Sequence, residues 1–198
     1  MTKRLLDLCI ALPALVLLSP LFLAFAVAIK LDSRGAVFFR QERMGRGFRP
    51  FRIYKFRTMV ADAPRRGGQL TVGHGDPRIT RVGRWLRKTK FDELPQMLNV
   101  LLGDMSIVGP RPEVPRYVEM FRPDFAEILS VRPGITDPAS LEYRDEAMLL
   151  AASDDPEKTY IDQILPAKLA ISKQYLARAS ALHDIGLMFR TLRHIGRT

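Results

Sequence analysis

The sequence has very few residues of the types that form disulfides and zinc sites. Its 198 residues include one cysteine, Cys9, which excludes a disulfide within the chain and a zinc site built from several cysteines. The three histidines, His74, His183 and His194, are scattered, and no two have the spacing of metal ligands. Internal repeats and low-complexity linkers are also missing. Residues 32–198 are therefore interpreted as one domain, preceded by a separate apolar segment over residues 1–31.

Acidic residues are scarce relative to basic ones. The chain has 21 Asp and Glu against 31 Lys and Arg, which gives a net charge of +10 and a pI of about 10.2. Such a surface attracts nucleic acid, anionic membrane lipids or phosphorylated substrates. Nucleic acid is not an expected partner, because the basic residues lack the aromatic-rich motifs of its usual binders. It would also leave the apolar N-terminus unexplained.

Charged side chains are missing from residues 8–29, which as a helix would be long enough to cross a hydrocarbon core of roughly 30 Å. One interpretation is a cleaved signal peptide, since Ala24-Phe25-Ala26 fits the small-x-small pattern. Asp7 and the basic residues after the cut argue against it. A second is a simple transmembrane span. Both flanks are basic, however, so one of them would lie on the disfavoured side of the membrane.

A third interpretation is a re-entrant helix that enters the membrane, breaks and returns to the same face. Ser19-Pro20 lies near the middle of the apolar run. Proline removes a backbone donor, and the serine hydroxyl can bond to the carbonyl that is freed. Both basic flanks would then stay on the cytoplasmic side. This interpretation is favoured because it explains the flanking charges and the central proline together.

The remaining chain predicts a small mixed sheet surrounded by helices, which is an α/β or α+β fold. Residues 36–59 have the pattern of a β-hairpin with a turn at Gly45-Arg46-Gly47. Further elements are expected in this order: a loop over 61–76, a helix over 78–88, a helix over 94–102, a strand over 105–108, a helix over 114–128, a turn over 132–134, and an amphipathic helix or helix pair over 168–195.

The last amphipathic segment allows two interpretations. One side of it carries a row of apolar residues, namely Leu176, Leu182, Ile185, Phe189 and Leu192. This row is expected to pack in the core or to form the contact of a homodimer. The alternative is a helix that lies on a membrane surface.

Asp92 and Glu93 are the candidate catalytic residues. They follow a group of basic residues and precede an apolar helical pattern, in which Pro95 is tolerated only in the first turn. The pattern places the helix start near Asp92, where an acidic side chain commonly caps a helix. The helix N-terminus and nearby cations would also keep Asp92 ionised, and an ionised carboxylate can attack phosphorus. Glu93 beside it is a candidate ligand for Mg²⁺, with substrate phosphates completing the coordination.

Several cations are candidates for phosphate binding. Lys55 and Arg57 belong to the second strand of the predicted hairpin, Arg111 to Gly-Pro-Arg-Pro and Arg132 to Arg-Pro-Gly. A buried diphosphate needs several cations, and arginine binds phosphate through two N–H groups at once.

An ordered series of motifs resembles one known family. The matching segments are KRLLD at 3–7, SP at 19–20, KFRTM at 55–59, DPRIT at 76–80, RKT at 87–89, DELPQ at 92–96, GDMSIVGPRP at 103–112 and RPGIT at 132–136. In this order they resemble the bacterial sugar transferases that act on polyprenyl phosphate, the monotopic phosphoglycosyl transferases, in their minimal catalytic form.

The resemblance implies an enzyme that works in two steps at the cytoplasmic face of the bacterial inner membrane. Asp92 would attack the β-phosphate of a UDP-sugar and release UMP. Polyprenyl phosphate, usually undecaprenyl phosphate, would then accept the sugar phosphate, which is the first membrane step of glycoconjugate assembly. Mg²⁺ is implied at Asp92 and Glu93. Lys55, Arg87 and Arg111 fall on motif positions associated with phosphates, and Arg78, within DPRIT, is counted with them.

The resemblance also implies a re-entrant membrane helix that hinges at Ser19 and Pro20. One segment departs from the family pattern: Asp137-Pro138-Ala139-Ser140 follows RPGIT, where Gly-x-x-Gln is common. No residue role is carried over to this loop or to the chain after it.

Overall fold

The apolar N-terminal segment forms a single long helix. A computed structural model describes residues 2–66, 70–73 and 75–195, and in it α1 (Thr2–Asp32) is continuous through Pro13 and Pro20. Among these residues it is the one helix long and apolar enough to cross a membrane. The Ser19 hydroxyl donates to the Val16 carbonyl at 2.8 Å. That carbonyl is the acceptor that Pro20, which has no N–H, leaves without its helical partner.

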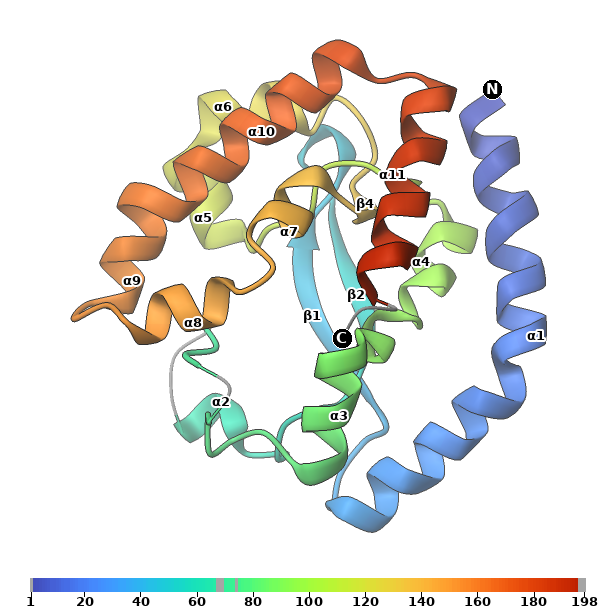
Figure 1. The fold of residues 1–198 in the computed structure, drawn as a ribbon, viewed down its shortest axis with the longest axis vertical. Helices are drawn as coiled ribbons and strands as arrows, with labels where there is room; N and C mark the ends of the chain where they lie inside the picture. The colour runs from blue at the N-terminus through green and yellow to red at the C-terminus, as the bar shows by residue number, and fades with distance from the viewer. Residues whose placement is uncertain (1, 67–69, 74, 196–198) are drawn as a thin grey trace.

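The predicted bond from serine to a freed carbonyl is thus confirmed, whereas the expected break of the helix is not seen. Figure 1 shows instead that α1 bends partway along its length and that its two halves run in different directions. A proline inside a helix commonly produces such a bend without ending the helix.

Both ends of α1 are bonded to the rest of the chain. Near its start, the Asp7 carboxylate accepts hydrogen bonds from the Ser106 hydroxyl and the Ile107 N–H, each at 2.9 Å. At its far end, the Asp32 carboxylate accepts from the Val82 N–H at 2.9 Å. The two halves of α1 therefore lie against the same folded domain.

The predicted hairpin is confirmed. β1 (Phe38–Met44) and β2 (Pro50–Phe56) pair antiparallel and are joined by the 3₁₀ turn η1 (Arg46–Phe48). Asn99, on α4 (Gln96–Leu102), donates to the Arg52 carbonyl and accepts from the Tyr54 N–H, both at 2.9 Å. These two bonds fix α4 against β2.

A second sheet consists of two short parallel strands, β3 (Ser106–Val108) and β4 (Gly134–Thr136). β3 was predicted, but β4 was missed because three residues are too few for an alternating pattern. The backbone segments at Gly109 and Gly134 approach so closely that a Cβ on Gly134 would lie 2.1 Å from the Gly109 nitrogen. One antiparallel and one parallel pair among many helices confirm the α+β fold class.

The helices around the DELPQ motif begin later than predicted. After α2 (Ala63–Arg66), α3 (Arg81–Thr89) starts at Arg81 rather than Arg78, because the Thr80 hydroxyl caps it by accepting from the Gly83 N–H. The 3₁₀ turn η2 (Phe91–Glu93) precedes α4, so the helix expected to start at Asp92 begins at Gln96. Pro95 has no N–H for the Phe91 carbonyl, and the Leu94 N–H bonds to that carbonyl instead. Within the predicted loop over 61–76, residues 67–69 and 74 lie outside the described part.

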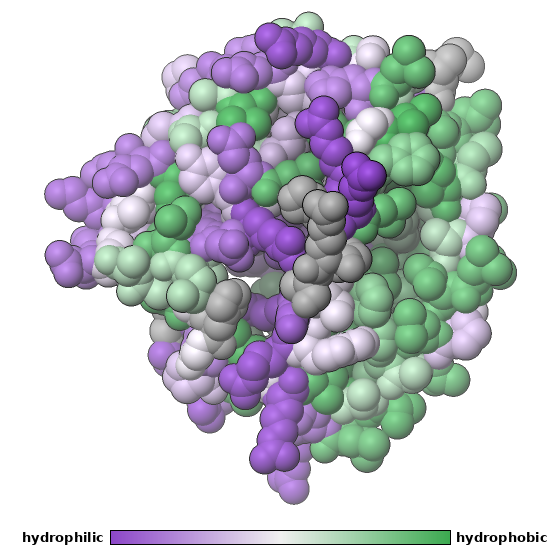
Figure 2. Space-filling model, viewed as in Figure 1, coloured by the Kyte–Doolittle hydropathy of each residue, from purple (hydrophilic) through white to green (hydrophobic). Residues whose placement is uncertain are grey.

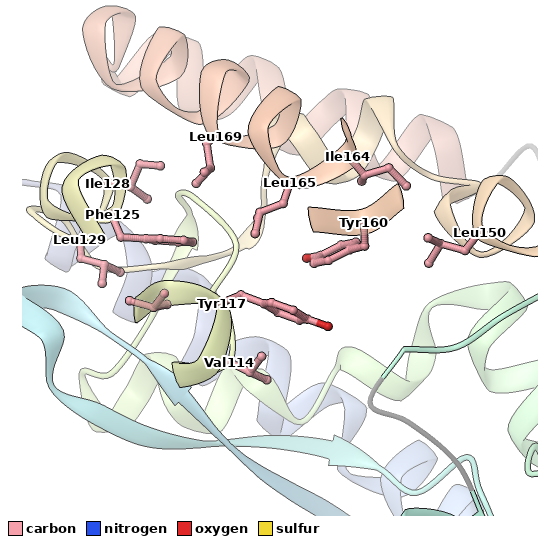
Figure 3. Close-up of a cluster of buried hydrophobic side chains, with 11 residues drawn as sticks. Val114, Tyr117, Phe125, Ile128, Leu129, Leu150, Tyr160, Ile164, Leu165 and Leu169 are labelled. Carbon is pink, nitrogen blue, oxygen red and sulfur yellow. The ribbon is translucent and has the colours of Figure 1, made fainter. Parts of the chain in front are cut away.

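The C-terminal half is helical. Where one helix was expected over 114–128, two occur, which meet at Phe121. The helices here are α5 (Pro115–Met120), α6 (Arg122–Ile128), α7 (Pro138–Glu142), α8 (Glu146–Ala151), α9 (Pro156–Thr159), the π-helix η3 (Tyr160–Ile164), α10 (Leu165–Arg178) and α11 (Ala181–Ile195). Figure 3 shows how Tyr117 of α5, Phe125 of α6 and Leu165 of α10 point toward one another in a buried apolar cluster.

The expected helix pair at the C-terminus is confirmed as α10 and α11. The prediction that the row of apolar residues packs in the core is wrong for the part of the row on α11. Leu182, Phe189 and Leu192 are 83%, 68% and 65% exposed. The opposite side of α11 faces the domain, where buried Asp184 pairs with Lys3 of α1 at 2.6 Å. Figure 2 shows hydrophobic residues gathered along the side of the molecule that α1 occupies in Figure 1.

Candidate active site

Glu93 joins two cations that come from distant parts of the chain. Its Oε1 accepts from Lys55 Nζ of β2 at 2.8 Å and from Arg111 Nη2 at 2.5 Å. Its Oε2 accepts from Arg111 Nη1 at 3.2 Å. The Glu93 side chain is 13% exposed, so these charge-assisted bonds are partly shielded from water. Three predicted site residues are thereby brought together.

The backbone around Arg111 is held by the parallel sheet. The Gly109 N–H donates to the Thr136 carbonyl at 3.0 Å, and the Pro110 carbonyl accepts from the Gly134 N–H at 2.9 Å. Proline at 110 and 112 further restricts the chain on both sides of Arg111. The Gly-Pro-Arg-Pro segment therefore presents Arg111 from a fixed backbone.

Asp92 is buried next to this cluster. Asp92 is 8% exposed, and within the described part of the chain its Oδ1 has no hydrogen-bond partner. Burial, followed by the negative charge of Glu93, raises the pKa of Asp92, whereas Lys55 and Arg87 act in the opposite direction. The expectation that a helix N-terminus keeps Asp92 ionised needs correction, because α4 begins four residues later and desolvation dominates.

The groups that act on Asp92 electrostatically include Glu93 and Lys55. Burial opposes ionisation of Glu93, but Arg111 and Lys55 outweigh it and lower the pKa of Glu93 well below its usual value. The same pairing with Glu93 raises the pKa of Arg111. Burial lowers the pKa of Lys55, and Glu93 opposes that effect. Glu93 is therefore ionised at neutral pH, and its charge is balanced by the two cations.

Arg87 of α3 also acts on this site. Its Nε donates to the Thr58 hydroxyl at 2.8 Å and its Nη1 to the Thr71 hydroxyl at 3.1 Å. Burial lowers the pKa of Arg87, and the charge of Asp92 is the strongest effect that opposes it. The two threonines were missed from the sequence, because neither has a local pattern that distinguishes it from other polar residues.

Arg78 lies at the edge of the site. It forms a two-pronged pair with Asp76, with Nε to Oδ1 at 2.9 Å and Nη2 to Oδ2 at 2.6 Å. Arg78 also lines a cavity of about 560 Å³, together with Arg66, Arg116 and Tyr117. The pair with Arg78 lowers the pKa of Asp76, and the charge of Arg87 contributes to the same effect.

Two predicted phosphate-binding residues have other partners. Arg57 donates to the carbonyls of Ser33, at 2.8 Å, and of Arg34, and so bonds β2 to the chain after α1. Arg132 donates from Nε to the Gly103 carbonyl at 2.8 Å, at the end of α4. The structure does not bring these two residues into the cluster, and their phosphate roles remain predictions.

Asp137 is a buried acid near the cluster that sequence reasoning left without a role. It caps α7 by accepting from the Ser140 N–H at 2.9 Å, while its Oδ1 has no partner in the described residues. Burial raises its pKa, and the bonds from Ser140 oppose this. An acid directly before a proline is typical of a helix N-cap, so the pattern could have revealed this capping role.

The carboxylates present fit a magnesium ion that shares its coordination with a substrate. Mg²⁺ is commonly bound by one or two carboxylates plus substrate phosphates. Asp92 supplies a buried oxygen without a partner, and Glu93 is the adjacent residue. The described residues contain no group of three or more His, Cys, Asp or Glu side chains suited to a metal. Asp92 and Glu93 are the two carboxylates that would hold such an ion, and a bound diphosphate would provide the other ligands.

Comparisons with known proteins identify the family of this chain. The family model described as bacterial sugar transferase matches residues 1–198. The chain is 42% identical to UDP-N-acetylgalactosamine-undecaprenyl-phosphate N-acetylgalactosaminephosphotransferase of Aeromonas hydrophila, over 98% of this chain and 43% of that protein. It is 37% identical to the exopolysaccharide production protein PSS of Rhizobium leguminosarum bv. phaseoli, over 96% of this chain and 92% of that protein.

A third relative is the UDP-glucose:undecaprenyl-phosphate glucose-1-phosphate transferase of Caulobacter vibrioides, which is 38% identical over 96% of this chain and 68% of that protein. The chain thus spans less than half of the Aeromonas protein and most of the Rhizobium one. Since the family model extends over every residue, the chain belongs to the bacterial sugar transferase family.

Proposed function

We propose that this protein transfers a sugar 1-phosphate from a UDP-sugar to polyprenyl phosphate, in most bacteria undecaprenyl phosphate, through a phosphosugar bound covalently to Asp92. The observation that carries the proposal is the buried Asp92 carboxylate, whose Oδ1 has no partner in the described chain and which lies in the field of Lys55 and Arg87. An anionic nucleophile beside cations suits attack on a phosphate. The relatives from Aeromonas and Caulobacter bear names that describe this type of transfer.

The chemistry balances in two displacements. An Asp92 carboxylate oxygen forms a bond to the β-phosphorus of the UDP-sugar, and the bond from that phosphorus to the bridging oxygen breaks, so that UMP leaves with the bridging oxygen. A phosphate oxygen of polyprenyl phosphate then attacks the same phosphorus. The Asp92 carboxylate leaves, and a sugar bound to the lipid through a diphosphate is formed. Because both displacements occur at one phosphorus, a single site serves a soluble donor and a lipid acceptor in turn.

The cations would offset the charge of the donor's diphosphate. Lys55 and Arg111 are already held by Glu93, and Arg87 by two threonines, so little ordering is needed when phosphates bind. The cavity beside Arg78 and Arg116 offers space for the nucleotide portion. A Mg²⁺ ion bound by Glu93 and Asp92 would add further neutralisation of the phosphate charge.

The test is UMP release before any acceptor is present. Purified protein in detergent with Mg²⁺ is mixed with UDP-N-acetylgalactosamine or UDP-glucose, the donors named in the relatives, and UMP is quantified at short times. The expected result is a burst of UMP equal to the amount of active enzyme, followed by turnover when undecaprenyl phosphate is added. Release of UMP that strictly requires the acceptor would argue for direct transfer and against the aspartyl intermediate.

The same proposal includes a re-entrant topology for α1, in which the helix enters the membrane from the cytoplasmic face and returns to that face. It is supported by the bonds from Asp7 to β3 and from Asp32 to the start of α3, which tie both ends of α1 to one domain. A span would place those ends about 30 Å apart on opposite sides. The exposed apolar side of α11, next to α1, suits the same interface.

Labelling from each membrane side tests this topology. In a Cys9→Ser background, Lys3→Cys and Arg34→Cys would each report one flank of α1. We expect a membrane-impermeant maleimide to label both positions in inside-out vesicles and neither in right-side-out vesicles. A permeant maleimide serves as the control for reactivity. Labelling of the two positions from opposite sides would establish a transmembrane span instead.

Glu93→Gln should move the acid limb of the pH profile for UMP release to lower pH. Attack requires ionised Asp92, so the rate rises as the pH passes the pKa of that group. Glu93 is a cause of the raised pKa of Asp92, and its removal also leaves Lys55 and Arg111 free to attract the remaining carboxylate. All these effects lower the pKa of Asp92. The acid limb is obtained from kcat/KM for the donor, and a limb that stays in place or moves upward would contradict the assignment.

A further inference from the structure

An aromatic cluster connects the membrane helix to the turn that carries Asp92. Phe25 of α1, Trp85 of α3 and Phe91 of η2 are in mutual contact, with ring centroids 5.6 Å apart for Phe25–Trp85 and Trp85–Phe91 and 5.7 Å apart for Phe25–Phe91. Phe25 is buried, whereas Trp85 is 48% exposed. Phe91 directly precedes Asp92 in the chain. One end of this cluster is therefore accessible, and the other adjoins the proposed nucleophile.

Lys90 lies at the same turn and has an unusual backbone conformation. Its φ of 60° and ψ of 14° are left-handed, in a position at the end of α3 where glycine is normally favoured. Such strain in a residue with a side chain is found most often at functional sites. In the described part of the chain the Lys90 ammonium has no ion-pair or hydrogen-bond partner, and the residue is exposed. The Lys55 ammonium, by contrast, is paired with Glu93.

The Lys90 charge is near enough to act on the acidic pair. It lowers the pKa of Asp92 and also that of Glu93, although burial is the largest influence on both. A phosphate bound to Lys90 would accordingly lie within electrostatic reach of Asp92. Since Lys55 and Arg111 are engaged by Glu93, Lys90 is available for a second phosphate.

The C-terminal half of α1 also exposes apolar side chains, on the side of the helix away from Phe25. On the C-terminal half of α1, Leu23, Val27 and Leu31 are 69%, 52% and 83% exposed. Figure 1 shows that half of α1 beside α3, and the contact between Phe25 and Trp85 joins the two helices. A molecule with an apolar chain and a phosphate at one end would match a partly exposed aromatic cluster next to a free cation.

We propose that Lys90, Trp85 and Phe91 form the acceptor subsite, in which the Lys90 ammonium binds the phosphate of polyprenyl phosphate and the two aromatic rings contact its first isoprene units. This inference rests on the proposed function, since the acceptor phosphate must reach the phosphosugar on Asp92. Lysine is suited to a phosphate as a compact charge on a flexible stem. The exposed face of Trp85 supplies apolar contact beside it.

The test compares Lys90→Gly with Lys90→Arg in nanodiscs of phosphatidylcholine that contain undecaprenyl phosphate. Glycine suits the left-handed backbone, so the first change removes the charge while it relieves the strain. A bond from a cation to a phosphate typically contributes enough that its loss weakens binding by about tenfold or more. We therefore expect Lys90→Gly to raise the acceptor KM by about tenfold.

The donor KM should change less, and Lys90→Arg should restore most of the acceptor affinity. Lys158→Gln, at an exposed lysine of α9, is the control for net charge and should not change the acceptor KM.

Two results would overturn the proposal. An unchanged acceptor KM in Lys90→Gly would show that the lysine does not bind the acceptor, and an equal rise in donor and acceptor KM would show a general effect on Asp92. In a second arm, phosphatidylglycerol is added to the nanodiscs. If it inhibits the wild type but not Lys90→Gly, the subsite belongs to anionic phospholipid, and the proposal is wrong. UMP release from donor alone is measured in parallel, so that failure of this subsite is distinguished from failure of the proposed function.

Discussion

Asp92→Asn should abolish the donor reaction while leaving the fold intact. An amide of the same shape cannot form the acyl phosphate, and the loss of a covalent nucleophile typically reduces rates by about 10⁴-fold or more. We therefore expect no burst of UMP and no phosphosugar adduct by intact-mass analysis at short times. The effect should be this large because the described residues offer no second buried carboxylate oxygen beside Lys55 and Arg87 that lacks a partner.

The same substitution should raise the melting temperature. Burial raises the pKa of Asp92, so the folded protein favours the protonated form, and ionisation at neutral pH destabilises the fold. Asparagine removes that charge, and a gain on the order of 1 kcal/mol would raise Tm by about 2–4 °C for a chain of this size. The difference in Tm should disappear as the pH falls below the ordinary carboxyl range, since Asp92 is then neutral in both states. Asp154→Asn, at an exposed acid, is the matched control and should change neither Tm nor turnover.

An Asp92→Asn protein that retains turnover within tenfold of wild type would place the nucleophile elsewhere.

Arg111→Met should reduce both stability and activity. It removes the two-pronged partner of Glu93 and leaves a mostly buried carboxylate with Lys55 alone. Loss of one partner of a buried pair costs about 3–5 kcal/mol, and here about 2 kcal/mol is expected because Arg111 is 29% exposed and Lys55 remains. Donor turnover should fall by about 100-fold or more, because a charge-assisted contact to the diphosphate is lost. Urea unfolding and initial rates of UMP release measure the two effects.

A double substitution separates the two roles of Arg111. Arg111→Met with Glu93→Gln should recover part of the lost stability, because the isolated buried charge is removed, but it should recover no activity. Arg122→Met breaks a pair with Glu119 in which both side chains are more than half exposed, and it should cost no more than about 0.5 kcal/mol. If Arg111→Met were no more destabilising than Arg122→Met, the pair with Glu93 would not contribute to the fold as described.

The hairpin and the bonding of Ser19 were predictable because they depend on neighbouring residues. Alternation along two strands with glycines between them specifies a hairpin locally, and Pro20 identifies which carbonyl loses its partner. The start of α4 was not predicted correctly. Its position depends on Lys90, whose left-handed backbone ends α3, and on bonds of 3₁₀ type through Leu94. A single strained residue of this kind has no periodic signal in a sequence.

The sequence alone identified the apolar helix, the adjacent acids Asp92 and Glu93, and a set of cations suited to phosphate. The tertiary structure decided which cations meet those acids: Lys55 and Arg111 contact Glu93, whereas Arg57 and Arg132 bond to backbone carbonyls elsewhere. It also decided that Asp92 is buried and that its pKa is raised. The reason is physical, since local bonding follows from neighbours in the chain. Burial and the charges around a carboxylate depend on segments that two sheets bring together from far apart in the sequence.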